Sequence, residues 1–584
     1  MPGTHGRHLR GAWRPDIMSE RSKFPRFEDI RFRNSRALNC EKTQKAIMNR
    51  ILRSAFFVVW ILGIAPLSVA QHEGHEPKDT IGWVPQELLE RPLPLRPGIG
   101  KLHEQVTTAS PEAQAYYDQG LAYLHSYVWI EAARSFHQAL RLDSSLAMGY
   151  VGLSDAYVGL LDVPSAAAAA ERAKSLAAKV SDRERTRILL WGLRIDYLQE
   201  SDDIKKYFSY RQALNDALSA SPNDPWLWIL RGFADEGTPT AHGQGGLVDT
   251  IAFYQTALRL SPDNFAAHHY LAHTLENHGP AKEALEQSEI YVRMAPAIPH
   301  AHHMHGHNLR KVGQTEQAIG EFLKAEELEN NYYRTENIPA QFDWHHAHNL
   351  QLLAMSYEAL GQMKAAEAAF REAFALPSYT DFADYNRKAW PEFLLDHVSA
   401  KEALAASQEL VNSQWAMARY AGHSLVGRAQ LALGHPEDAR AELGMAEQEM
   451  EQMPARVLRS LSDSVLLRAE IMLREGRTQE ANQLMERIVK DVVAVSGPDG
   501  WSEAVFQLEY IARVAREASD WTLAESAAQE MIRHDPSYAG GYFGLGLVAE
   551  HQGNASTAKQ EFAMAQKLWS KADADVRPSQ TQKP

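Results

Sequence analysis

The chain has 584 residues, of which 45% are hydrophobic and 23% are charged, and its net charge is −14 at neutral pH. This length can hold several compact domains or one long repeat array. The acidic balance argues against general binding to nucleic acids or to anionic membranes.

A secretory signal peptide is predicted for residues 48–70. The stretch MNRILRSAFFVVWILGIAPLSVA has a basic start, an apolar run and small residues at its end. The apolar run is too short to span a bilayer comfortably. Because a signal normally begins a protein, we interpret Met48 as the initiator and residues 1–47 as a mistaken upstream extension of the gene. The alternative is a short membrane anchor with a cytoplasmic tail.

Cleavage of this signal predicts an exported protein, periplasmic or extracellular, with no stable membrane insertion afterwards. Residues 1–70 carry 13 basic and 5 acidic residues, so the mature chain has a net charge near −22. They also carry the only cysteine, Cys40. The mature chain therefore has no disulfides, thiolate ligands or cysteine nucleophile, and any metal site must be built from nitrogen and oxygen atoms.

Residues 71–110 are rich in proline, as in RPLPLRPGIGKLHE, and show no sustained helical period. This composition predicts an extended lead-in to the folded part of the chain, or a cap on its first repeat. From residue 111 onward, apolar residues recur with helical spacing. We therefore expect the rest of the chain to be built from helices.

A repeat of 34 residues organises these helices. Counted from Ala539 in the last copy, the marked positions 4, 7, 8, 15, 20, 24 and 27 carry Tyr542, Leu545, Gly546, Gly553, Ala558, Phe562 and Ala565. Small residues at positions 8 and 20 let two antiparallel helices approach closely, while the large apolar residues fill the space between repeats. Other copies are marked by Gly120, Ala132 and Phe136, by Trp228 and Gly232, and by Ala354, Ala366 and Phe370.

These positions resemble the tetratricopeptide-repeat family over nearly the whole mature chain. The resemblance implies an all-α fold, a right-handed superhelix (α-solenoid) of roughly nine to eleven helix pairs. It also implies that the first helix of each pair lines a concave groove and that each pair packs mainly on its neighbours.

The predicted organisation has four parts after the lead-in. They are an N-terminal repeat segment (111–262), a histidine-rich repeat segment (263–378), a C-terminal repeat segment (379–570) and a disordered tail (571–584). No Gly-rich phosphate loop, nucleophile elbow or HExxH motif occurs in the sequence.

Histidine is concentrated in one segment, since 12 of the 23 histidines of the mature chain lie between His268 and His348. His269 and His273 occupy positions 5 and 9 of one repeat. His303 and His307 occupy the same positions of the next repeat, 34 residues later. Residues four apart share a helical face, so two adjacent helices present paired imidazoles in the same phase. In this family such positions usually line the groove.

Further donors share these faces. His300 lies on the face of His303 and His307, and Glu276 extends the face of His269 and His273. A third helix brings His348, with His345 one turn earlier. The candidate metal ligands are His269, His273, His300, His303, His307, His348 and Glu276.

Imidazole nitrogens and a carboxylate suit zinc, copper, nickel or iron, and they suit calcium poorly. Two alternatives remain open. The histidines form a buried hydrogen-bond network, or they line a groove for an acidic peptide. His268, His302 and His305 fall at positions that pack between helices, so we predict structural roles for them, and His278 is expected to face solvent.

The stretches AHHYLAHTLEN, PHAHHMHGH and DWHHAHNLQLL also resemble a histidine-rich group of exported bacterial tetratricopeptide proteins whose function is not established. The resemblance implies that the six candidate histidines belong together. Related chains often carry another histidine at the position of Gln351, so this chain departs from the pattern by one ligand.

The leading hypothesis is an exported, non-enzymatic scaffold. Its groove binds a protein or peptide partner, and its histidine-lined site binds a transition metal or a small polar ligand. The alternative is a metal-dependent enzyme of hydrolase type, with Glu276 as the general base beside a histidine-bound cation. The lack of any known catalytic pattern favours the scaffold.

Overall fold

The computed structural model describes residues 84–200, 203–235, 247–451, 453, 461–495 and 497–574. All of them belong to one compact unit, which begins at Pro77. Their regular secondary structure is helical, and no strand occurs among them. The predicted upstream extension and signal peptide lie outside the described residues.

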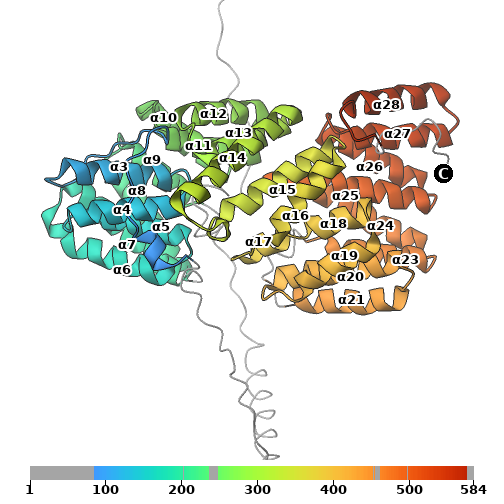
Figure 1. Ribbon diagram of the computed structural model, residues 1–584, viewed down its shortest axis with the longest axis horizontal. Coiled ribbons are helices and arrows are strands. Elements are labelled where there is room, and N and C mark those ends of the chain that lie inside the picture. Colours follow the sequence, from blue (N-terminus) through green and yellow to red (C-terminus); the bar gives the residue numbers. More distant parts are fainter. Residues whose placement is uncertain are drawn as a thin grey trace, which may run out of the picture. The chain divides into compact units, whose positions relative to one another are not determined.

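Consecutive helices pack against each other in pairs along the chain, which confirms the predicted α-solenoid (Figure 1). The pairs are α3 (Pro111–Leu124) with α4 (Trp129–Leu142), α5 (Ala147–Gly159) with α6 (Val163–Leu176), α7 (Asp182–Gln199) with α8 (Ile204–Ala220), α9 (Pro225–Phe233) with α10 (Thr250–Leu260), α11 (Phe265–His278) with α12 (Ala281–Met294), and α13 (Pro299–Lys311) with α14 (Thr315–Glu336). They continue with α15 (Trp344–Ala359) and α16 (Met363–Ala375), α18 (Ala389–His397) and α19 (Ala400–Val411), α20 (Ala416–Ala432) and α21 (Pro436–Met450), α23 (Asp463–Arg474) and α24 (Thr478–Val492), α25 (Pro498–Glu517) and α26 (Trp521–His534), and α27 (Ala539–His551) and α28 (Ala555–Leu568). Shorter elements are α2 (Gln86–Leu89), α17 (Asp381–Asn386) and the 3-10 turns η1 (Ala177–Lys179) and η2 (Ala340–Phe342).

Helix ends follow local signals in the sequence. Ser181 and Glu184 form a reciprocal capping box at the start of α7, which satisfies two backbone N–H groups that the helix leaves unpaired. The side chains of Asn264 and Asp343 cap α11 and α15 by accepting one hydrogen bond each from a backbone N–H of the first turn. Turns inside several pairs contain a glycine with positive φ, such as Gly313 at 79°, a conformation that glycine adopts without strain.

The small residue at position 8 lets paired helices approach closely, as predicted, and in three pairs it lies against the aromatic ring at position 24. A Cβ atom added at Gly120 of α3 would come 2.5 Å from Cε1 of Phe136 on α4. The same contact recurs between Gly306 and Phe322, and between Gly546 and Phe562. The paired helices can therefore approach closely only because glycine at position 8 has no side chain.

Gly120→Ala should lower the free energy of unfolding by about 1–3 kcal/mol, because the added methyl group forces the fully buried Phe136 ring to move. Gly320→Ala, in the exposed middle of α14, meets nothing within 4 Å and should stabilise the protein by about 0.5–1 kcal/mol through helix propensity. Denaturant unfolding followed by circular dichroism measures both. Equal effects of the two substitutions would contradict the register.

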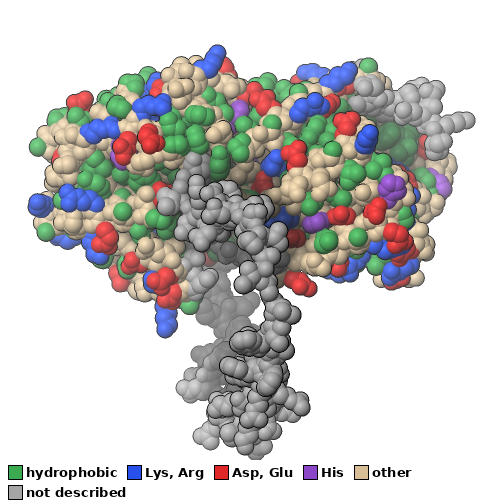
Figure 2. Space-filling view, turned by 60° about the horizontal axis from the view of Figure 1, so that its bottom comes forward, with side chains coloured by type: hydrophobic (Ala, Val, Ile, Leu, Met, Phe, Trp, Pro, Cys, Tyr) green, Lys and Arg blue, Asp and Glu red, His purple; other side chains and the backbone are tan. Residues whose placement is uncertain are grey.

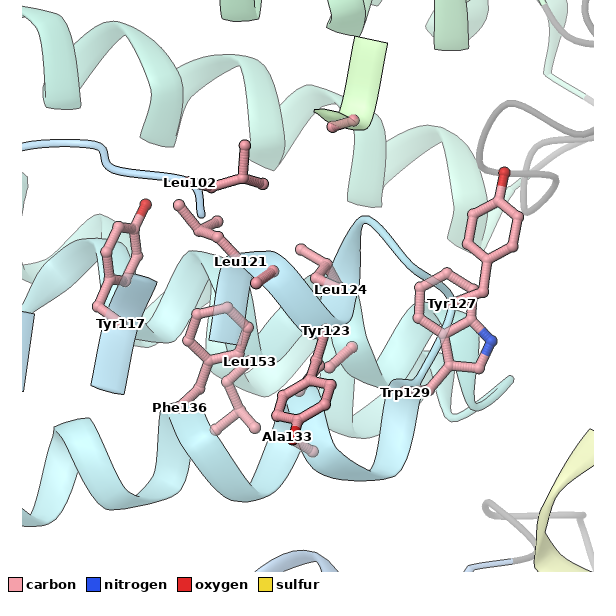
Figure 3. Packing of buried hydrophobic residues seen from close by; sticks show 14 of the residues in the cluster. Leu102, Tyr117, Leu121, Tyr123, Leu124, Tyr127, Trp129, Ala133, Phe136 and Leu153 are labelled. Atoms are coloured by element: carbon pink, nitrogen blue, oxygen red, sulfur yellow. The ribbon is translucent and has the colours of Figure 1, made fainter. Parts of the chain in front are cut away.

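The described part of the lead-in packs on the first repeats and is not a free linker. Leu93, Ile99, Leu102 and Val106 are buried in the same hydrophobic cluster as α3 and α4, and Figure 3 shows Leu102 beside Leu121. At the other end, the first residues of the predicted tail are also packed. The backbone N–H of Asp573 donates to the carbonyl oxygen of Gly361 at 3.0 Å, so packing continues beyond residue 570.

Pairs contact mainly their sequence neighbours, as predicted, but the chain also folds back on itself. The turn between α3 and α4 lies against α11, where the Nδ1–H of His269 donates to the carbonyl oxygen of His125 at 2.7 Å. Arg310 of α13 forms a buried ion pair with Asp535, in the turn before α27. These long-range contacts cover the face of α11 and α13 that carries the histidines.

Among the described residues, no helix combines the length and apolar character that crossing a membrane requires. Basic and acidic side chains are interspersed over the face in Figure 2.

Candidate metal centre

Seven histidines from α11, α13 and α15 form one contiguous group, which we call the histidine cluster. Its members are His269, His273, His300, His303, His307, His345 and His348. All are buried except His348, whose side chain is 20% exposed. They form three overlapping triads, and within each triad one ligand nitrogen per residue lies within 4.8 Å of the others.

The first triad consists of His269, His273 and His300. Its three Nε2 atoms lie 3.0, 3.1 and 3.4 Å apart. Ligand nitrogens bonded tetrahedrally to one cation at about 2.0–2.1 Å are separated by about 3.3 Å. The three atoms therefore already have the spacing that one transition-metal ion requires.

The second triad consists of His300, His303 and His345, and the third of His303, His307 and His348. Neighbouring triads share His300 or His303. Close ring contacts connect the whole group, with centroids 4.1 Å apart for His303 and His307 and 4.4 Å apart for His303 and His345.

Oxygen atoms orient several rings from their Nδ1 side. The carbonyl oxygen of His125 can only accept, so Nδ1 of His269 carries the proton and its Nε2 keeps a lone pair. Asn349 donates to the carbonyl oxygen of Phe322, so its Oδ1 accepts from Nδ1 of His303 at 2.9 Å. This arrangement, with the far nitrogen held by an oxygen, is typical of histidines that bind metals.

Carboxylates lie near the Nδ1 atoms of three further rings, one in hydrogen-bond contact and two at a longer distance. Nδ1 of His345 lies in hydrogen-bond contact with Glu329. Nδ1 of His307 lies 3.4 Å from Oε1 of Glu276, and Nδ1 of His348 lies 3.4 Å from Oδ1 of Asp499 on α25. The negative charge near the histidine cluster is therefore concentrated at its second and third triads.

Several buried nitrogen atoms of the histidine cluster have no hydrogen-bond partner in the described part of the chain. They are Nδ1 of His300, Nε2 of His303, both ring nitrogens of His307 and Nε2 of His345. Buried polar atoms are rarely left unpaired, because each costs about 1–3 kcal/mol. A hydrogen-bond network alone leaves these atoms unexplained, whereas a cation would use the Nε2 lone pairs of His303, His307 and His345.

Burial keeps the imidazoles neutral, the form that binds metals. It holds the pKa values of His269, His300 and His303 well below the ordinary value. It lowers the pKa of His273 to about 3 and that of His348 to about 4. Desolvation is the largest cause in each case, because it penalises the charged imidazolium form, and neighbouring histidines add to the effect.

The groove prediction needs a correction, because the histidine faces are covered. The ring of Tyr127, in the turn between α3 and α4, lies 4.6 Å from the His269 ring and 4.9 Å from the His300 ring, centroid to centroid. Trp344 covers His345 at 5.4 Å. The repeat register placed the histidines on the correct face, but the fold-back of the chain turns this face into an interior.

Glu276 lies beside the histidine cluster without belonging to a triad. Burial alone would raise the pKa of its carboxyl group, but His307 and Lys311 outweigh burial and the net pKa is lowered. The carboxylate is thus negatively charged next to Nδ1 of His307. This position suits a residue that orients an imidazole better than the general base of the enzyme hypothesis.

His345 is a triad member that the candidate ligand set did not include. It lies three residues before His348, a spacing that places both on one face of α15, so the sequence contained the signal. His345 lies before the first position of the repeat register, and for this reason it was left out of the ligand set.

The histidines expected to be structural lie outside the triads. His268 contacts Gln287 at 2.7 Å through Nδ1, His302 contacts Glu321 at 2.6 Å through Nδ1, and His305 contacts Ser288 at 3.3 Å. His278 is exposed at the end of α11, as predicted.

Comparison with known families gives one match, in which residues 347–378 match the family described as tetratricopeptide repeat. These residues cover most of α15 and all of α16. No curated protein matches the chain significantly.

Solved structures that match include a human IFIT1 dimer with m7Gppp-AAAA, at 13% sequence identity and a TM-score of 0.33, covering 79% of this chain and 91% of that chain. Another is the APC/C hetero-tetramer Cut9-Hcn1, at 12% identity and a TM-score of 0.29, covering 80% of this chain and 95% of that chain. These TM-scores are too low to carry an argument about partners. The match thus identifies one tetratricopeptide repeat, at the pair α15 and α16, within the series of consecutive helix pairs.

Proposed function

We propose that this protein is an exported scaffold that binds a protein or peptide partner and holds a transition metal in its histidine cluster. The tetratricopeptide-like fold supports the scaffold role, because stacked helix pairs create extended binding surfaces. Since the histidine cluster is covered, the partner uses a part of the groove outside it.

The convergence of three Nε2 atoms from α11 and α13 is the observation that supports metal binding most strongly. Three of them lie 3.0–3.4 Å apart, and His269, one of these three, has its opposite nitrogen held by an oxygen atom. Zinc, copper, nickel and iron all accept imidazole ligands, and the nitrogen donors leave the choice among them open.

Protein purified without an affinity tag from the exported fraction of its native host should contain near-stoichiometric transition metal by elemental analysis. The metal-free protein should bind Zn²⁺, and His273→Gln/His303→Gln should weaken binding at least about 100-fold, because each of the three triads then loses a ligand. The amino-terminal residue of the same preparation, expected to be Gln71, tests export.

The matched control is His268→Gln/His302→Gln, which removes one histidine from each of the same two helices but none from a triad. It should retain full Zn²⁺ binding. Equal binding by both double variants, or no metal in either the native or the titrated protein, would exclude the proposed metal site.

A further inference from the structure

We propose that the histidine cluster holds two metal ions of unequal accessibility, an enclosed ion in the first triad and a solvent-reachable ion in the third triad. This inference rests on the proposed metal-binding function and concerns the number of ions and the way they exchange.

The overlap of the triads limits the number of ions. The second triad shares one histidine with each of its neighbours, whereas the first and third triads have no member in common. Each imidazole supplies one Nε2 lone pair, so two ions are the most that the three triads can bind. A single ion in the second triad would leave the other four imidazoles of the histidine cluster without a cation.

Carboxylates offset the repulsion between two buried cations. Glu276 and Asp499 each lie 3.4 Å from an imidazole of the third triad, and Glu329 contacts His345 between the outer triads. Three negative charges thus face the part of the histidine cluster that would receive the second cation. Without them, two dications in a low-dielectric interior would repel each other strongly.

The first triad is enclosed by Tyr127, which is only 2% exposed. Its ring lies 4.6, 4.9 and 5.8 Å from the rings of His269, His300 and His273. Figure 3 shows Tyr127 next to Trp129 at the start of α4. An ion at the first triad has an aromatic wall between itself and solvent, as in closed structural metal sites.

The backbone of Tyr127 is strained, which indicates that surrounding contacts hold this ring in place. Its φ is 58°, in the left-handed region where Gly313 and Gly361 lie in the corresponding turns of other pairs. A residue other than glycine in this region costs about 1–2 kcal/mol. Leu161 has the same φ of 58° in the turn between α5 and α6, which provides a matched control away from the Tyr127 ring contacts.

The third triad, in contrast, borders a small cavity. The cavity has a volume of about 10 Å³ and is lined by residues that include His307, Glu276 and Ser502. This space is about the size of one water molecule. Together with the partial exposure of His348, it gives the second ion one position for a solvent ligand, as in open metal sites.

The test uses the full metal-free chain, Zn²⁺ alone and an excess of a chromogenic chelator. Unmodified protein should bind two equivalents and release them in two phases. Tyr127→Gly should accelerate the slow phase at least tenfold and leave the fast phase unchanged, while Leu161→Gly should change neither. His307→Gln should lose the fast phase and one equivalent.

The possible failures are distinguishable. No binding by unmodified protein would overturn the proposed function itself, whereas a single equivalent would leave that function standing and overturn the two-ion site. Two equivalents released in one phase, or a slow phase that Tyr127→Gly leaves unchanged, would refute the unequal accessibility. Stoichiometry and release from unmodified protein decide the proposal even where a variant fails to fold.

Discussion

Metal-free protein should lose most of its stability between pH 6.5 and pH 5. Five histidines of the histidine cluster have lowered pKa values: the buried His269, His273, His300 and His303, and the partly exposed His348. In the unfolded chain the same groups titrate near pH 6.5. The unfolded state therefore binds more protons than the folded state throughout this window, so stability falls as the pH falls.

The size of this effect follows from linkage. Each such histidine lowers the free energy of unfolding by about 1.4 kcal/mol per pH unit below 6.5, until the pKa of the folded state is reached. That pKa is about 3 for His273 and about 4 for His348. At pH 5 one such histidine lowers the free energy of unfolding by about 2 kcal/mol. Five together lower it by about as much as the whole stability of a typical domain. His346 and His397 have raised pKa values and oppose the loss in part.

Denaturant unfolding at a series of pH values, with a chelator present, measures this dependence. The slope against pH should correspond to an uptake of several protons on unfolding, and His273→Gln should reduce the uptake by about one proton near pH 5. Saturating Zn²⁺ should shift the loss to lower pH, because protons and metal compete for the same nitrogens. Stability that stays constant from pH 7 to pH 5 would refute the buried neutral cluster.

Lys388→Met should lower the free energy of unfolding by about 3–5 kcal/mol, the usual cost of leaving a buried charge without its partner. Lys388 is fully buried at the start of α18, and its Nζ lies 3.3 Å from Glu392, 3.3 Å from Glu503 and 3.6 Å from Asp463. Burial raises the pKa of Glu392 to about 7 even though Lys388 lowers it. The lysine therefore holds together carboxylates from α18, α23 and α25.

The control is Lys174→Met, because Lys174 pairs with Glu171 on the surface, with both side chains about 70% exposed. That substitution should leave the denaturation midpoint essentially unchanged, because solvent screens the pair. Lys388→Met/Glu503→Gln should recover part of the loss, since it removes one of the unpaired charges. Denaturation midpoints for the three variants measure the effects, and a Lys388→Met protein as stable as the unmodified chain would contradict the assigned ion pairs.

Local sequence patterns predicted a series of helix pairs, although the described residues form twelve pairs and the recognisable repeats indicated roughly nine to eleven. Gly306 and Ala318, small residues at positions 8 and 20, already predict that α13 and α14 approach closely, because contacts within a pair depend on residues close in sequence. The same register placed His269 and His273 in phase with His303 and His307, since helical faces follow from spacing alone.

The tertiary structure decided what lies opposite those faces. The hydrogen bond from His269 to the backbone of His125, the ring of Tyr127 over the first triad and the carboxylate of Asp499 beside His348 all come from distant parts of the chain. They meet the histidines because small rotations between successive pairs add up along a solenoid. A local sequence pattern contains no information about this accumulated rotation. The sequence by itself therefore predicted a histidine-lined groove. Only the tertiary structure shows that the histidines form a buried cluster with oriented rings.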